Sequence, residues 1–102
     1  MPVLGELENA VMEILWVHRE PMPVRDVHEL LARRRDLAYT TVMTVLDRLS
    51  KKGIANRELQ GRAWLYSPAR TRVELVTAEV QDLLAWLSPE ERARVLAELD
   101  RI

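Results

Sequence analysis

Threonine hydroxyls, one methionine and several cations gather in the segment AYTTVMTVLDRLSKKG, residues 38–53. At 100° per residue, its apolar side chains share one face of a helix, which predicts a buried side. The other face begins with small hydrogen-bonding groups and ends with cations, an arrangement suited to a polyanion. The apolar residues are Val42, Val45, Leu46 and Leu49. Thr40, Thr44, Asp47 and Lys51 lie opposite this side, with Thr41 and Arg48 at one edge and Met43 at the other.

This second face has the chemistry of a DNA-recognition helix. Such a helix enters the major groove with its N-terminal residues at base edges, where bulky side chains would hold it away. Threonine hydroxyls bond bases or phosphates, and methyl groups contact the thymine methyl. The alternative is a merely solvent-exposed face, which Asp47 favours because a carboxylate repels phosphate. Lys51, four residues on, or the neighbouring Arg48 can neutralise that carboxylate.

The charge of the chain is unevenly distributed. The whole chain has a net charge of −1, yet residues 33–70 carry nine Lys or Arg and three Asp or Glu, a net +6. Residues 71–102 carry four basic and seven acidic groups, a net −3. A basic run is often only a solvated face. Here the cations fall on neighbouring elements, which favours a polyanion site.

The residue inventory argues against an enzyme and against a metal centre or cofactor. The chain has no cysteine, which excludes disulfides, thiolate metal sites and cysteine nucleophiles. His18 and His28 are too isolated in the sequence to form a ligand set. Three glycines cannot make a glycine-rich phosphate loop, and no nucleophile with a base or HExxH pair is present.

The length of 102 residues suits one small domain with an appended element. No apolar run approaches the roughly 18 residues that cross a membrane. The N-terminal sequence MPVLGELENAVME has no basic region followed by an apolar one, so it does not resemble a signal peptide. We therefore expect a soluble cytoplasmic protein with no membrane partner.

Two further helices are predicted before the threonine-rich one. The first spans about residues 4–18, and the second begins near Pro23 or Val24 and ends in the sequence ARRRD. The prolines of EPMP separate them, because proline cannot continue a helix. Apolar spacings of three and four define their packed faces. The predicted core residues are Leu7, Ala10, Val11, Ile14 and Leu15 in the first, and Val27, Leu30 and Leu31 in the second.

Two short strands follow the third helix, over residues 54–58 and 63–67, and Gly61 suits the tight turn between them. We expect Trp64 and Tyr66 to share one face and to serve in packing. Arg57 and Arg62 are expected near the tip of the hairpin, as contacts to DNA. Three helices and a basic hairpin make a winged helix-turn-helix, a mainly α (α+β) fold, predicted here over residues 1–70.

Three motifs carry a resemblance to a known family: LGELENAVMEILW, VRDVHELLARRRDLAYTTVMTVLDRLSKKGIANRE and GRAWLYSP. In this order and separation, residues 4–70 resemble the DNA-binding domain of the penicillinase repressor family (BlaI/MecI/CopY type). The resemblance implies a bacterial dimeric repressor that binds an inverted repeat in double-stranded DNA. It implies groove-reading residues at Thr40, Thr41, Met43 and Thr44, and phosphate contacts at Arg48, Lys51 and Arg62.

The last third of the chain, residues 71–102, is predicted to be a two-helix dimerisation element. Its apolar residues follow spacings of three and four, which is an a/d seam. The sequence SPEE then begins a second helix, with Ser88 as cap and Glu91 completing a capping box. Pairing with a second chain by two-fold symmetry would bury both apolar stripes, and folding back on the winged domain is the alternative. The seam comprises Val73, Val76, Val80, Leu83 and Leu87, and the second stripe Val95, Leu96, Leu99 and Ile102.

Two departures from the family pattern bear on regulation. Family members usually carry additional helix between the two C-terminal elements, which here follow each other directly. A membrane sensor protease cuts that region in familiar members, so the resemblance implies such a protease as a further partner. The copper-responsive branch uses cysteine thiolates, which this chain lacks.

A second class of function is a winged-helix protein-interaction module that does not contact DNA. Asp47 and the net charge of −1 favour it. Salt dependence separates the two, because a protein that neutralises phosphates loses DNA affinity steeply as salt rises.

Overall fold

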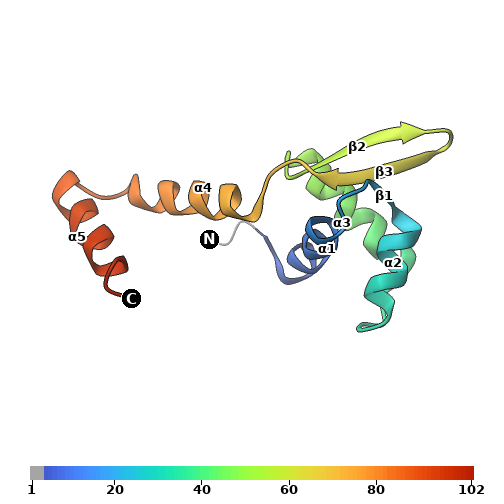
Figure 1. Ribbon diagram of the computed structural model, residues 1–102, viewed down its shortest axis with the longest axis horizontal. Helices are drawn as coiled ribbons and strands as arrows, with labels where there is room; N and C mark the ends of the chain where they lie inside the picture. The colour runs from blue at the N-terminus through green and yellow to red at the C-terminus, as the bar shows by residue number, and fades with distance from the viewer. Residues whose placement is uncertain (1–3) are drawn as a thin grey trace. The chain divides into compact units, whose positions relative to one another are not determined.

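The computed structural model describes residues 4–102, which form helices and a small antiparallel sheet (Figure 1). The chain divides after Thr71 into two compact units. The first unit holds three helices and all three strands, which confirms the predicted mainly α winged-helix fold. The elements are α1 (Glu6–Val17), β1 (Met22–Pro23), α2 (Val24–Ala32), α3 (Tyr39–Lys51), β2 (Ala55–Gln60), β3 (Ala63–Pro68), α4 (Arg72–Leu84) and α5 (Pro89–Leu99).

The core of the first unit forms around α3, as its apolar spacing predicts. All four predicted side chains of α3 are buried, with at most 5% of their surface exposed. The helix contacts α1, α2 and β2, so its apolar face is enclosed by three elements. The other buried hydrophobic side chains of this unit are Val11, Met12, Leu15, Met22, Val24, Val27, Leu31, Ile54, Ala55 and Tyr66.

The buried face of α1 differs from the predicted one. Val11 and Leu15 are buried as expected, but Glu8 and Met12 complete the face in place of Ala10 and Ile14. The predicted Leu7, Ala10 and Ile14 are only half-buried. The reason is tertiary: α1 packs against α2, α3 and β3, and these neighbours select which side of an amphipathic helix turns inward.

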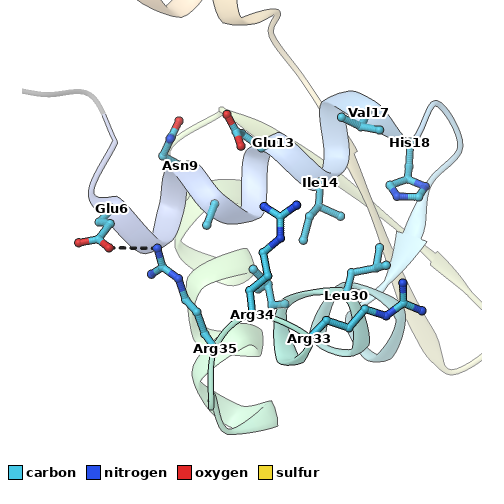
Figure 2. A pocket seen from close by; sticks show the side chains of 12 residues that line it. Glu6, Asn9, Glu13, Ile14, Val17, His18, Leu30, Arg33, Arg34 and Arg35 are labelled. Atoms are coloured by element: carbon cyan, nitrogen blue, oxygen red, sulfur yellow. Dashed lines mark hydrogen bonds and ion pairs between the residues drawn. The ribbon is translucent and has the colours of Figure 1, made fainter.

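The half-buried side of α1 instead borders a groove of about 430 Å³ beside the end of α2 (Figure 2). Leu30 of α2, also predicted as core, is half-buried and lines this groove rather than the centre of the unit. The groove is lined by Glu6, Asn9, Ala10, Glu13, Ile14, Val17, His18, Leu30, Leu31, Arg33, Arg34 and Arg35.

The end of α3 has the predicted glycine stop. Gly53 has φ of 75°, a left-handed conformation that a side chain disfavours. The Gly53 amide donates to the Ser50 carbonyl at 3.1 Å, and the Ile54 amide donates to the Leu49 carbonyl at 3.0 Å. This paired bonding is the Schellman motif, which satisfies the last carbonyls and turns the chain into β2.

The wing is a β2–β3 hairpin, in which each strand extends slightly beyond its predicted range. Gln60 pairs with Ala63 across a two-residue loop of Gly61 and Arg62. Gly61 has φ of 64°, which fits the first central position of a type II′ turn. The two-residue strand β1 was not predicted; it pairs with β3, so the sheet order is β1-β3-β2. Two residues are too few to show alternation, and the prolines around them indicate only a break.

The second unit consists of α4 and α5. The predicted capping box is present, since the Glu91 amide donates to Ser88 Oγ at 3.2 Å and the Ser88 amide donates to Glu91 Oε1 at 3.0 Å. The predicted seam is shorter than expected, because α4 ends at Leu84 and Leu87 lies between the helices. The buried residue of α4 is Leu75, which lies on a different side of the helix from the seam.

A partly buried ion pair joins α1 to the end of α3. Lys52 Nζ lies 2.9 Å from Glu8 Oε2 and 3.1 Å from Oε1, and Oε1 also accepts the Gly5 amide at 3.0 Å. Burial by itself raises the pKa of the Glu8 carboxyl. The two hydrogen bonds and the charges of Lys52 and Arg48 outweigh burial, so this pKa lies below its ordinary value of 4.5. The pair therefore favours the folded state while Glu8 is ionised.

Replacing Glu8 by glutamine is expected to lower the free energy of unfolding by about 1 kcal/mol at pH 7. The carboxylate charge is lost, while the amide oxygen still accepts from Gly5. Because the folded-state pKa is below the unfolded one, the contribution is present above pH 4.5 and disappears as pH falls through the lowered value. Urea unfolding from pH 7 to pH 3 should show the two curves converging in acid.

Glu6→Gln is the matched control for this change. Glu6 lies in the same helical turn and pairs with Arg35 at 3.0 Å, but its side chain is 84% exposed. Its loss should change stability by less than about 0.5 kcal/mol. Equal effects of the two substitutions at every pH would contradict the role assigned to Glu8.

Candidate DNA-binding surface

The structure brings the six predicted residues of α3 onto its exposed face. Burial of the apolar face fixes the rotation of α3, so the opposite side points to solvent. The first turns carry hydroxyls and a thioether, and the last turn carries cations. The six exposed side chains are Thr40, Thr41, Met43, Thr44, Arg48 and Lys51.

The Thr44 hydroxyl is already oriented by the helix. It donates to the Thr40 carbonyl at 2.9 Å, one turn earlier. In this rotamer the hydroxyl proton forms a hydrogen bond within the helix, and the oxygen lone pairs remain available to accept a hydrogen bond from a ligand. An accepting oxygen matches the exocyclic amino groups of adenine and cytosine, both of which face the major groove.

The N-terminus of α3 is arranged to attract an anion. Its N-cap, Ala38, makes no side-chain hydrogen bond, and the first turn holds no acidic residue. The helix dipole therefore has an uncompensated positive end beside Thr40 and Thr41. Sequence reasoning missed Tyr39 here, which is 45% exposed at the first helical position. The signal that could have identified it is a hydroxyl-bearing ring next to three threonines.

His28 supports the segment that leads into α3. Its Nε2 lies 2.7 Å from the Leu37 carbonyl oxygen, and its ring meets Tyr39 edge to face with centroids 5.8 Å apart. Among residues 4–102, no three His, Asp or Glu side chains are grouped to hold a metal ion. No helix in the same residues is both long and apolar enough to cross a bilayer.

Asp47 is paired on two sides. Lys51 Nζ lies 3.0 Å from its Oδ2, one turn along α3, and Arg57 Nη1 of the wing lies 3.4 Å from its Oδ1. The carboxylate that argued against a DNA-facing surface is thus compensated by two cations. Of the two partners that the sequence predicts, Lys51 and Arg48, the ion pair of α3 forms with Lys51, whereas the contact with Arg57 comes only from the fold.

The two wing arginines occupy different places. Arg62 lies in the turn at the tip, as predicted. The expectation that Arg57 lies near the tip is wrong, because it is paired with Tyr66, well down the hairpin. Its guanidinium carbon lies 4.2 Å from the centroid of the Trp64 ring, a stacked cation–π contact. The hairpin register places Arg57 beside Asp47, a proximity that no local sequence pattern indicates.

Three arginines of the basic segment lie elsewhere. Arg33, Arg34 and Arg35 line the groove beside α1, where Arg35 Nη2 donates to Glu6 Oε1 at 3.0 Å (Figure 2). They contribute to the net +6 of residues 33–70 without lying on the exposed face of α3. The cations on the exposed face of α3 and in the wing are Arg48, Lys51, Arg57 and Arg62, while Lys52 at the end of α3 is paired with Glu8.

The sequence matches the model of one protein family, described as penicillinase repressor, over residues 4–101. The chain belongs to the penicillinase repressor family. This confirms the resemblance drawn from the three motifs and extends it through the second unit. The transcriptional regulator BlaI of Mycobacterium tuberculosis is 55% identical over 82 residues, which cover 80% of this chain and 59% of that protein. This chain therefore spans about three fifths of the length of that relative.

Solved structures of the family match the winged unit. The solution structure of the DNA-binding domain of the repressor BlaI has a TM-score of 0.62 and 30% identity, covering 70% of this chain and 85% of that one. The monomeric form of BlaI from Bacillus licheniformis in complex with the blaP half-operator has a TM-score of 0.60 and 29% identity. That match covers 72% of this chain and 88% of the other.

Proposed function

We propose that this chain is a sequence-specific DNA-binding transcriptional repressor. The observation that carries the proposal is the exposed face of α3. It has an N-terminus with no side-chain cap and no acidic residue, exposed threonines of which Thr44 is oriented by a hydrogen bond, and cations in the last turn. Arg62 at the wing tip extends this surface toward a neighbouring phosphate or the minor groove. The half-operator bound by the Bacillus licheniformis relative supports the same use of the fold.

The proposed mechanism divides affinity from specificity. The first turn of α3 reads base edges in the major groove, and the cations of α3 and the wing neutralise phosphates. The chain acts by occupying DNA rather than by catalysis, in the cytoplasm of a bacterium. The pairing of Asp47 with two cations weakens the main argument for a protein-interaction module without DNA binding.

We further propose that residues 72–102 dimerise the protein on an inverted repeat. In the single chain several apolar side chains of α4 and α5 are exposed, with Val73, Val76 and Leu83 of α4 more than half exposed. A two-fold partner would cover both stripes at once. A sensor protease that cuts this region is a further proposed partner, on the family resemblance alone.

Selection of bound duplexes from a random DNA pool at about 0.15 M salt, where the Debye length is about 8 Å, tests the function. We expect enrichment of an inverted repeat whose half-sites lie about one helical turn, or a multiple of it, apart. A single enriched half-site would retain DNA recognition and remove the dimer. If no sequence is enriched and no DNA is retained, the better hypothesis is a winged-helix protein-interaction module that does not contact DNA.

Separate substitutions should distinguish base reading from phosphate binding. Thr44→Val removes the accepting oxygen and should cost about 1–3 kcal/mol of discrimination at one base position. Arg62→Ala should weaken binding evenly across sequences and lower the salt slope by about 1. Arg19→Ala removes an exposed arginine outside α3 and the wing and serves as control. Binding titrations on the operator and single-base variants would contradict this division if both changes reduced all affinities equally.

The dimer is tested by placing a charge in the exposed stripe. Leu83→Glu should leave the fold intact, because Leu83 is 52% exposed in the single chain, but should prevent burial of the seam. Sedimentation should then report a monomer, with half-site affinity kept and inverted-repeat affinity lost. Gln81→Glu adds the same charge to another side of α4 and should remain dimeric. A dimer that survives Leu83→Glu would place the interface elsewhere.

A further inference from the structure

The contact between Asp47 and Arg57 joins the recognition helix to the wing. Asp47 lies in the middle of α3, and Arg57 lies on β2, opposite Tyr66 of β3. The side chains of Asp47 and Arg57 are 37% and 35% exposed, so the contact lies at the edge of solvent, beside the proposed DNA surface. It is therefore a direct side-chain link between the two parts proposed to touch DNA.

Arg57 is held from two directions. Its Nη1 bonds Asp47 Oδ1 at 3.4 Å, and its guanidinium lies 4.2 Å from the centre of the Trp64 ring. A guanidinium that stacks on a ring and bonds a carboxylate has a defined orientation, whereas a free arginine samples many rotamers. Its other N–H donors are left for a ligand, in a direction set by the two contacts.

Asp47 also restrains Lys51, at 3.0 Å on the next turn. One carboxylate thus neutralises two cations, Lys51 and Arg57. Without it, both cations could bind phosphates wherever the protein sits along a DNA duplex. Non-specific binding rests on such phosphate contacts, whereas operator binding adds base contacts from the first turn of α3. A carboxylate in this position lowers affinity for DNA in general more than affinity for the operator.

We propose that Asp47 is a specificity-determining residue that acts through Arg57. It fixes the wing arginine against α3 in the one orientation that suits the operator, and it withholds Arg57 and Lys51 from non-specific phosphate contacts. This inference rests on the proposed function and adds to it the residue that sets the ratio of operator to non-specific affinity.

The test compares Asp47→Asn with the wild type on operator and on random-sequence duplex, between 50 and 250 mM salt. Counterion release predicts a slope change of about 0.9 for each phosphate newly neutralised, which is about tenfold in affinity near 0.1 M salt. We expect Asp47→Asn to bind random duplex about tenfold more tightly with a steeper salt slope, and to gain less on the operator. The ratio of the two affinities should therefore fall.

The matched control is Glu58→Gln, which removes one negative charge from the residue next to Arg57. Since side chains alternate along a strand, Glu58 lies on the opposite face of the wing. Its loss should raise both affinities by a similar small factor and leave the ratio unchanged. Circular dichroism should show the same helix content for both variants and the wild type.

A double substitution separates the proposed route from simple charge removal. If Asp47 acts through Arg57, most of the effect of Asp47→Asn on the ratio should disappear in an Arg57→Gln background, and only the part due to Lys51 should remain. A readout without DNA is the Arg57 side-chain NMR signal, which the Trp64 ring current shifts in the wild type and which should move toward its free position in Asp47→Asn.

The outcomes are distinguishable. An Asp47→Asn effect equal to that of Glu58→Gln, or unchanged in the Arg57→Gln background, would overturn this inference alone. A wild-type chain that retains no duplex even at 50 mM salt would overturn the proposed function and this inference with it. A lower ratio that depends on Arg57 would support both.

Discussion

Burial of one face of α3 determines both what holds the winged unit together and what it presents to solvent. Val42, Val45, Leu46 and Leu49 are enclosed by α1, α2 and β2. Each such side chain contributes roughly 1.5–3 kcal/mol when it leaves water. A helix cannot rotate without exposing this face, so the threonines and cations on the other side are held in place. The candidate recognition surface is thus a consequence of the core.

Hydrophobic burial has no preferred geometry, whereas ion pairs and hydrogen bonds join particular atoms of two elements. The Glu8–Lys52 pair ties α1 to the C-terminal end of α3, and the Asp47–Arg57 contact ties the middle of α3 to the wing. Trp64 limits the orientation of Arg57 from the other side. These contacts involve few atoms, yet each one links α3 to another element at a defined point.

The second unit differs from the first in how much of its apolar surface is buried. Its two helices are well specified locally, with a capping box at Ser88, but little of their apolar surface is covered within the chain. Trp86, between the helices, is 87% exposed. Short helices gain most of their stability from packing rather than from propensity. This imbalance is the physical basis for the proposal that the unit forms a dimer on an inverted repeat.

Local patterns in the sequence determined the buried face of α3, the stop at Gly53, the hairpin turn at Gly61 and the cap of α5. Each of these depends on periodicity or on backbone conformations within a few residues, which the sequence records directly. The family could also be inferred, because its motifs are contiguous. The inward side of α1 and the two-residue strand β1 could not, since they depend on distant segments. The same holds for Glu8 and Arg57, whose partners lie 44 and 10 residues away. Only the tertiary structure brings these charges together, because the distance between side chains is set by the packing of whole elements.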